Sequence, residues 1–217
     1  MADSKITALT ENTTPILTDL LPMVDDPAGT PATQKITVST LADLFTSNSL
    51  YRQAIINGNF DVWQRGTTLT TTAVTWLADR WLSFRAGGAS GQYSQQTAGL
   101  NGSIYSLRIQ RPSGNTATGA LYLQHGLESK NSIPLRGQKL TLSFWAKCGA
   151  DYSSTSAVLS SAIISGTGTD EGIDDGYTGQ ATIGSGSHTL TTSWQKFTVT
   201  TSAVVAVTVN QIAVRFS

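Results

Sequence analysis

The chain has 217 residues, of which 39% are hydrophobic and 13% are charged, and its 14 basic side chains balance 14 acidic ones. A net charge of zero gives no basic field for phosphates, so we expect no nucleic-acid partner. No stretch approaches the ~20 apolar residues of a membrane helix, and the first residues carry no secretion signal. We therefore expect synthesis in the cytoplasm and no membrane insertion.

Residues 1–48 differ in composition from the rest of the chain, since they hold four of the six prolines and no Trp or Tyr. The phrase Lys-Ile-Thr occurs at 5–7 and again at 35–37, on either side of an apolar strand candidate at 18–25. Thr40 is expected to cap a short helix over residues 41–45. A segment this small cannot build its own core, so it is either a flexible leader or an irregular docking arm. Regularly spaced apolar residues favour the docking arm: Ile6, Leu9, Leu20, Leu21, Val24, Ile36 and Leu41.

Residues 49–217 predict an all-β domain. The whole chain holds 32 Thr and 24 Ser, which is typical of β-structure with small hydroxyl side chains. Clusters rich in Gly and Ser, such as 166–179 and 184–187, separate short alternating runs and read as turns. Many short strands separated by turns, without a long helix, predict an antiparallel β-sandwich of the jelly-roll kind. The expected strands are 51–56, 81–84, 105–110, 120–125, 139–147, 157–165, 193–200 and 203–216, the last broken by a turn or bulge at 210–211.

The clearest strand lies at residues 139–147. Leu142 and Phe144 fall on one face, whereas Ser143 and Trp145 fall on the other. Trp194 and Trp81 are likewise out of phase with their apolar neighbours. Exposed aromatic rings stack on sugars, but a loop or a neighbouring subunit would cover such rings equally well. The candidate glycan-binding residues are Trp145, Trp194, Trp81, Arg85, Gln195, Tyr122 and Gln124.

Catalytic chemistry finds little support. His125 is in phase with Leu121 and Leu123 and is predicted to pack inside, whereas His188 is predicted to lie exposed in a Gly/Ser turn. No serine-hydrolase elbow or zinc-protease motif occurs, and no pair of carboxylates can be assigned to a cleft. We therefore predict that the chain is not an enzyme and needs no cofactor.

One loop is a candidate for a structural calcium ion, because calcium prefers several oxygen ligands from a flexible loop. Its spacing matches no EF-hand, and a merely solvated loop is the alternative. The acidic residues concerned are Asp170, Glu171, Asp174 and Asp175.

The leader resembles the start of many tail-fibre and tail-appendage proteins of tailed bacteriophages. The matching phrases are KITAL at 5–9, DLLPMVD at 19–25, KIT at 35–37 and then Leu41. In such proteins this segment commonly attaches the appendage to the virion. The resemblance implies a virion protein whose partners are other tail or neck proteins and which forms a homotrimer.

The second part of the chain resembles the jelly rolls of carbohydrate-binding modules. The phrases are NGNFD at 57–61, LTLSFWAK at 140–147 and TTSWQKFTVT at 191–200. The motif NGNFDVWQRG at 57–66 is also typical of phage fibres. Members of the family often hold a calcium ion near the first strand, which nominates Asp61, but its usual partner lies on a final strand that has no counterpart here. The resemblance therefore predicts an open edge at the strand that ends near residues 214–217, to be completed either by another chain or by a further portion of a longer fibre.

Taken together, these observations predict a tail fibre or related virion appendage. Residues 1–48 would attach it, and residues 49–217 would form a jelly roll that recognises a surface glycan. One alternative is a capsid or neck decoration protein whose jelly roll binds nothing. The other is a carbohydrate-binding module of a larger glycan-active protein.

Overall fold

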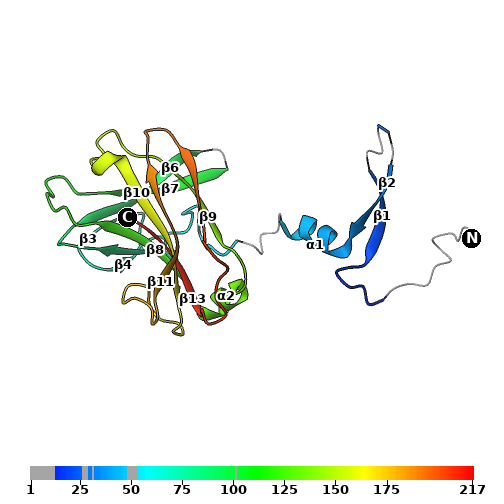
Figure 1. Ribbon diagram of the computed structural model, residues 1–217. Helices are drawn as coiled ribbons and strands as arrows, with labels where there is room; N and C mark the ends of the chain where they lie inside the picture. The colour runs from blue at the N-terminus through cyan, green and yellow to red at the C-terminus, as the bar shows by residue number, and fades with distance from the viewer. Residues whose placement is uncertain (1–12, 26–28, 31, 48–52, 101) are drawn as a thin grey trace, which may run out of the picture. The chain divides into compact units, whose positions relative to one another are not determined.

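The computed structural model describes residues 13–25, 29–30, 32–47, 53–100 and 102–217. The chain divides into two compact units, Met1–Ala54 and Ile55–Ser217, which are described separately (Figure 1). The predicted boundary at 48/49 lies a few residues before the division at 54/55. We refer to the second unit as the β-domain.

The first unit contains a β-hairpin followed directly by a helix. Strands β1 (Leu20–Asp25) and β2 (Ala32–Thr37) are antiparallel, with Leu20 opposite Thr37. Helix α1 (Val38–Ser47) begins at once, and its cap is Thr37, whose hydroxyl oxygen accepts the amide hydrogen of Thr40 at 3.0 Å. The prediction that Thr40 caps a helix over 41–45 was therefore wrong, and the described part of this segment is regular rather than irregular.

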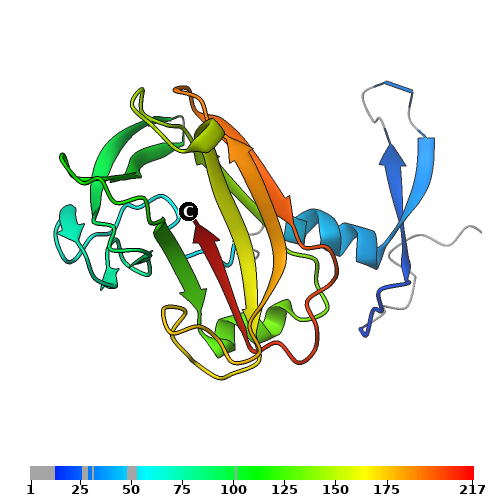
Figure 2. The same ribbon diagram turned by 60° about the vertical axis from the view of Figure 1, so that its left-hand side comes forward.

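A six-stranded antiparallel sheet forms one layer of the β-domain. Its strand order is β11-β10-β13-β8-β5-β4, and Figure 2 shows β13 between β8 and β10. The bounds are β4 (Thr75–Trp76), β5 (Leu82–Arg85), β8 (Leu121–Leu127), β10 (Val158–Gly166), β11 (Ala181–Thr189) and β13 (Gln211–Phe216). The predicted open edge at the last strand was wrong, because β13 is hydrogen-bonded on both sides.

Two smaller antiparallel sheets lie against one face of this sheet. The first has the order β3-β6-β7 and the second pairs β12 with β9. Their bounds are β3 (Thr68–Thr71), β6 (Gly91–Leu100), β7 (Ser103–Gln110), β9 (Thr141–Ala146) and β12 (Gln195–Thr200). Short helical turns occur at α2 (Ser129–Ser132), η3 (Ile133–Leu135) and η4 (Thr155–Ala157).

Contacts between the layers show that the domain is a β-sandwich. The ring of Phe144 on β9 lies 4.8 Å from that of Phe216 on β13, and Leu142 and Val199 are buried beside it. Tyr93 on β6 is 1% exposed and makes a side-chain hydrogen bond with Ser83 on β5. The prediction of an all-β antiparallel sandwich is confirmed, because apolar residues from every sheet meet in one interior.

The other face of the six-stranded sheet is covered in part by the loop between β10 and β11. Ile173 and Tyr177 of this loop pack on Leu82, Ile164 and Ala213, and all five are buried. Gly166 permits this approach, since a Cβ atom there would stand 2.4 Å from the Cβ of Tyr177. The part of this outer face that contains Arg215 does not belong to the cluster covered by the loop.

Several predicted strands need correction. Residues 53–56 form no strand, and the turn predicted at 184–187 is part of β11. Residues 203–210 also form no strand: they make a loop in which Val205 and Val209 are buried while Val207 is 75% exposed. The turn or bulge predicted at 210–211 is the point where this loop becomes β13.

Candidate functional site

The outer face of the β9–β12 sheet presents an exposed tryptophan among hydroxyl groups. Trp145 is 48% exposed and lies opposite Lys196 across the strand pair. Farther along the pair, Ser143 lies opposite Thr198, and the hydroxyls of Thr141 and Thr200 are 2.9 Å apart. We call this surface the Trp145 face; its residues are Thr141, Ser143, Trp145, Lys147, Trp194, Lys196, Thr198 and Thr200.

Trp194 lies at the end of the same face and is held in place. Its indole Nε1 donates to the carbonyl oxygen of Ala98 at 2.8 Å, and the Nζ atom of Lys147 lies 5.1 Å from the ring centroid. The ammonium group therefore interacts with the π-system of Trp194. Trp145 has no such cation among the described residues, so it is the aromatic ring of this face that a ligand can reach.

Trp81 does not contribute to a surface, which contradicts its place among the candidates. It is 3% exposed, its Nε1 donates to the carbonyl oxygen of Asn57, and its ring lies 5.0 Å from those of Phe60 and His125. Trp81 has the same parity as Ser83, which meets Tyr93 in the sandwich interior, whereas Leu82 packs under Ile173 and Tyr177 on the outer face. The apolar neighbours of Trp81 therefore mark the outer face of the sheet, and the side taken for a surface is the interior. Its ring is thereby directed into the interior.

The remaining candidates lie away from the Trp145 face. The Nε atom of Arg85 donates to the carbonyl oxygen of Thr72, and the side chain of Gln195 accepts a hydrogen bond from Thr191 at 3.1 Å. Gln195 alternates with Lys196 and so lies on the opposite side of β12. Tyr122 and Gln124 are on β8 of the six-stranded sheet, and Gln124 is fully buried.

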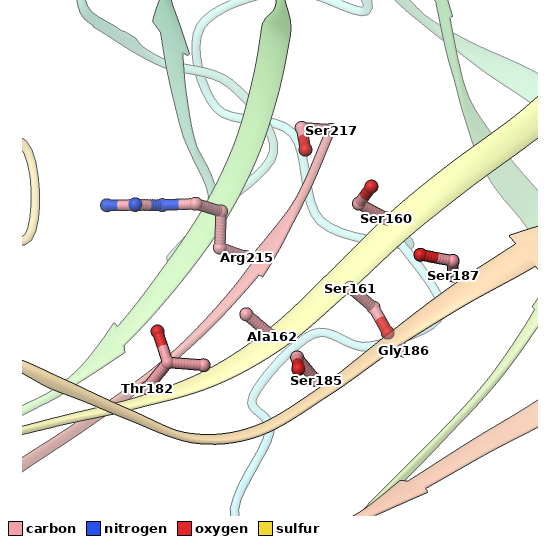
Figure 3. Close-up of a pocket in the computed structure, with 9 residues that line it drawn as sticks. All are labelled: Ser160, Ser161, Ala162, Thr182, Ser185, Gly186, Ser187, Arg215 and Ser217. Atoms are coloured by element: carbon pink, nitrogen blue, oxygen red, sulfur yellow. The ribbon is translucent and has the colours of Figure 1, made fainter. Parts of the chain in front are cut away.

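A groove crosses the open part of the outer face of the six-stranded sheet, and the sequence did not reveal it. It has a volume of about 460 Å³ and is formed by β10, β11 and β13 (Figure 3). Small residues and hydroxyl groups line it, with one charged side chain, that of Arg215. We call it the serine groove; its lining residues are Ser160, Ser161, Ala162, Thr182, Ser185, Gly186, Ser187, Arg215 and Ser217.

Strand pairing explains why these residues meet. Ser187 lies opposite Ser160, Ser185 lies opposite Ala162, and Ala162 lies opposite Arg215 on the other side. Directly opposed residues of antiparallel strands project from the same face. A sequence signal does exist, since small residues alternate at Ser160 and Ala162 and at Ser185 and Ser187, but it requires knowing that 184–187 is strand.

The two histidines are structural. His125 is fully buried, as predicted, and burial, assisted by the charge of Arg80, lowers its pKa to about 4. His188 was predicted to be exposed, but it lies on β11, where its Nε2 atom is 2.8 Å from the hydroxyl of Ser161. Its ring packs on Phe144, and burial lowers its pKa. In the described chain no carboxylate bonds to His188, so Ser161 and His188 lack the third group of a hydrolytic triad.

Two carboxylates of the acidic loop are engaged in hydrogen bonds, one to α2 and one within the loop. The carboxylate of Asp170 accepts the amide hydrogen of Ser129 at 2.8 Å, and Glu171 accepts from both the amide and the hydroxyl of Thr178. These bonds to Thr178 lower the pKa of Glu171. Within the described ranges no three His, Cys, Asp or Glu residues, Asp61, Asp174 and Asp175 included, are placed to hold a metal ion.

Comparison of the chain with protein-family models, with curated proteins and with solved structures finds no match. Among the described residues, no helix has the length and apolar character needed to span a membrane.

Proposed function

We propose that the chain is a structural protein of a tailed-phage virion appendage whose β-domain recognises a surface glycan through the Trp145 face. The observation that carries the glycan assignment is the 48% exposure of Trp145 within a regular strand pair lined by hydroxyls. Sugar rings offer an apolar face for stacking and hydroxyls for bonding, and this face offers a partner for each.

The path of the chain supports the resemblance to a jelly roll. From β5 onward the strands pass to β6–β7, back to β8, over to β9, back to β10–β11, over to β12 and back to β13. Repeated crossing between two layers is typical of that fold. Because one sandwich architecture hosts many functions, the glycan proposal depends on the side chains of the face.

The first unit supports an attachment role. Leu20, Leu21 and Met23 on β1 are 54%, 39% and 42% exposed, and a two-stranded hairpin is at best marginally stable by itself. A partner that buried these side chains would stabilise the hairpin. Tail or neck proteins, or the other subunits of a homotrimer, would supply such a surface.

The test compares two tryptophans of nearly equal exposure. Covering the exposed half of Trp145 removes ~100 Å² of aromatic surface from water, which is worth about 2–3 kcal/mol. We expect Trp145→Ala to weaken binding to a bacterial surface polysaccharide at least about tenfold without changing the unfolding transition. Trp76→Ala, which removes a ring 49% exposed, is the matched control and should bind as the parent does.

Binding of the parent protein and both variants is measured on a glycan array. Equal binding by Trp145→Ala and the parent would contradict the assignment of this face. Absence of binding to any surface polysaccharide would favour the decoration protein, in which the same fold only packs.

A further inference from the structure

We infer that the serine groove is a second binding site, specific for sugars that carry a carboxylate, with Arg215 as its anion-binding residue. The groove lies on the outer face of the six-stranded sheet, whereas the Trp145 face is the outer face of the opposite layer. This site is therefore separate from the one in the proposed function and does not depend on it.

The guanidinium of Arg215 is fixed from two sides. Its Nε donates to the Oε1 atom of Gln124 at 2.7 Å, and its central carbon lies 5.6 Å from the centroid of the Tyr122 ring. Tyr122 in turn packs on Phe84 at 5.5 Å. Figure 3 shows the side chain extended at one end of the groove. A fixed fork of this kind can bind a carboxylate with little loss of side-chain entropy.

Arg215 has no anionic partner in the part of the chain that the structure describes, where the two ion pairs are Arg65–Asp79 and Arg80–Glu128. No side chain that lines the groove is acidic. Tyr177 does not serve either, because burial raises its pKa to about 12 and keeps the phenol neutral. The two Nη groups of the guanidinium are therefore available to a ligand.

A second unused donor lies beside Arg215. Gln124 lies directly opposite Arg215 in the sheet and is 0% exposed. The bond from Arg215 fixes its Oε1 atom, which leaves Nε2 as a buried donor with no hydrogen-bond partner among the described residues. A buried donor without an acceptor is costly. Gln124 does not line the groove, so Arg215, whose guanidinium it holds in place, is the residue that favours an acceptor-rich group at this end.

The other end of the groove favours a sugar over a simple anion. Ser160, Ser185 and Ser187 project from the same face, and each hydroxyl can both donate and accept. Ala162 and Gly186 form a floor without bulky side chains. A volume of about 460 Å³ falls within the ordinary range of small-ligand sites. The combination fits a hexuronic acid, with its carboxylate at Arg215 and its hydroxyls toward the serines.

The test is a titration of the full chain with glucuronate, galacturonate and N-acetylneuraminate, followed by amide chemical shifts. At least one acid should shift resonances of β10, β11 and β13. Glucuronate or galacturonate, if it is the acid that binds, should bind about tenfold or more tightly than glucose or galactose. Arg215→Met should weaken that binding at least about tenfold, and Arg215→Lys should weaken it less, because it keeps the charge but loses the fork.

Arg65→Met is the matched control, because it removes the same charge from an exposed side chain elsewhere in the β-domain and should bind as the parent does. Trp145→Ala should also bind the acid normally, which separates this site from the Trp145 face. Any of three results would overturn the inference: no acid shifts these strands, Arg215→Met binds as well as the parent, or acetate or phosphate binds as tightly as the acidic sugar.

Discussion

The stability of the β-domain should fall in mild acid because of His125. Its Nε2 atom accepts the amide hydrogen of Ile56, and its ring packs edge-on against Trp81. Burial, then the charge of Arg80, lowers the pKa from 6.5 to about 4, whereas Glu128 acts in the opposite direction. The folded state thus favours the neutral ring. Its stabilisation is complete above pH 6.5 and is lost as the pH falls from there toward 4.

The expected loss follows from the two pKa values. A tenfold change in proton affinity is worth about 1.4 kcal/mol, so the gap between 6.5 and about 4 corresponds to ~3 kcal/mol of unfolding free energy. Urea unfolding followed by tryptophan fluorescence measures it, because all five tryptophans lie in the β-domain. The measurement is made at pH values that span this gap.

His125→Gln provides the control, since its amide can still accept from Ile56 but does not titrate. We expect the variant to be less stable than the parent at neutral pH and to lose about 3 kcal/mol less between the two pKa values. His188, whose pKa is also lowered, titrates in both proteins and cancels in the comparison. Parallel pH profiles for the two proteins would refute this account of His125.

Two further predictions concern the hairpin and one glycine. Leu21→Asp should release the protein from virions, measured by sedimentation, without changing the fluorescence unfolding of the β-domain. Thr33→Asp, at an exposed polar position of the same hairpin, should remain attached. Gly119→Ala should lower the unfolding free energy by about 3 kcal/mol or more, because the new Cβ would stand 1.9 Å from the carbonyl oxygen of Ala86. Gly114→Ala, with open space around it and a φ of 79°, should cost only about 1 kcal/mol.

The strands that the sequence predicts well are those with an apolar and a polar side. Residues 141–146 and 195–200 alternate cleanly and pair with each other as β9 and β12. The longest strand, β6, was missed, because GQYSQQTAGL is rich in glycine and glutamine. Its pairing with β3 and β7 fixes it as a strand, and such context overrides local propensity.

The loop at 203–210 shows that alternation alone does not establish a strand. Val205 is buried with its amide and carbonyl bonded to Gln138 and Gly137, whereas Val207 points to solvent. The hydrogen-bond partner of the Val205 backbone is thus a connecting segment at 137–138, which is not a strand. Apolar spacing places Val205, Val207 and Val209 on one side, so it predicts the burial of Val205 and Val209 but is wrong for Val207, and it does not identify the partner of the backbone.

The two candidate surfaces also differ in how far a single segment of sequence predicts them. Trp145 can be identified from its own strand, since it breaks a local pattern, and the structure leaves it exposed. The serine groove needs the order β11-β10-β13, which no single segment encodes. With 24 serines in the chain, the few that line the groove do not stand out in the sequence.

The position of β13 ties the groove to the stability of the fold. Val214 points into the sandwich and is 5% exposed, while its neighbour Arg215 projects from the opposite face into the groove. The strand lies between β8 and β10, so a shift of one residue in its pairing would bury the guanidinium and expose the valine. The cost of burying an unpaired charge therefore holds the register, and the same register places Arg215 beside Gln124 and the serines. A binding residue on a central strand is in this way positioned by the packing of the whole domain rather than by a loop.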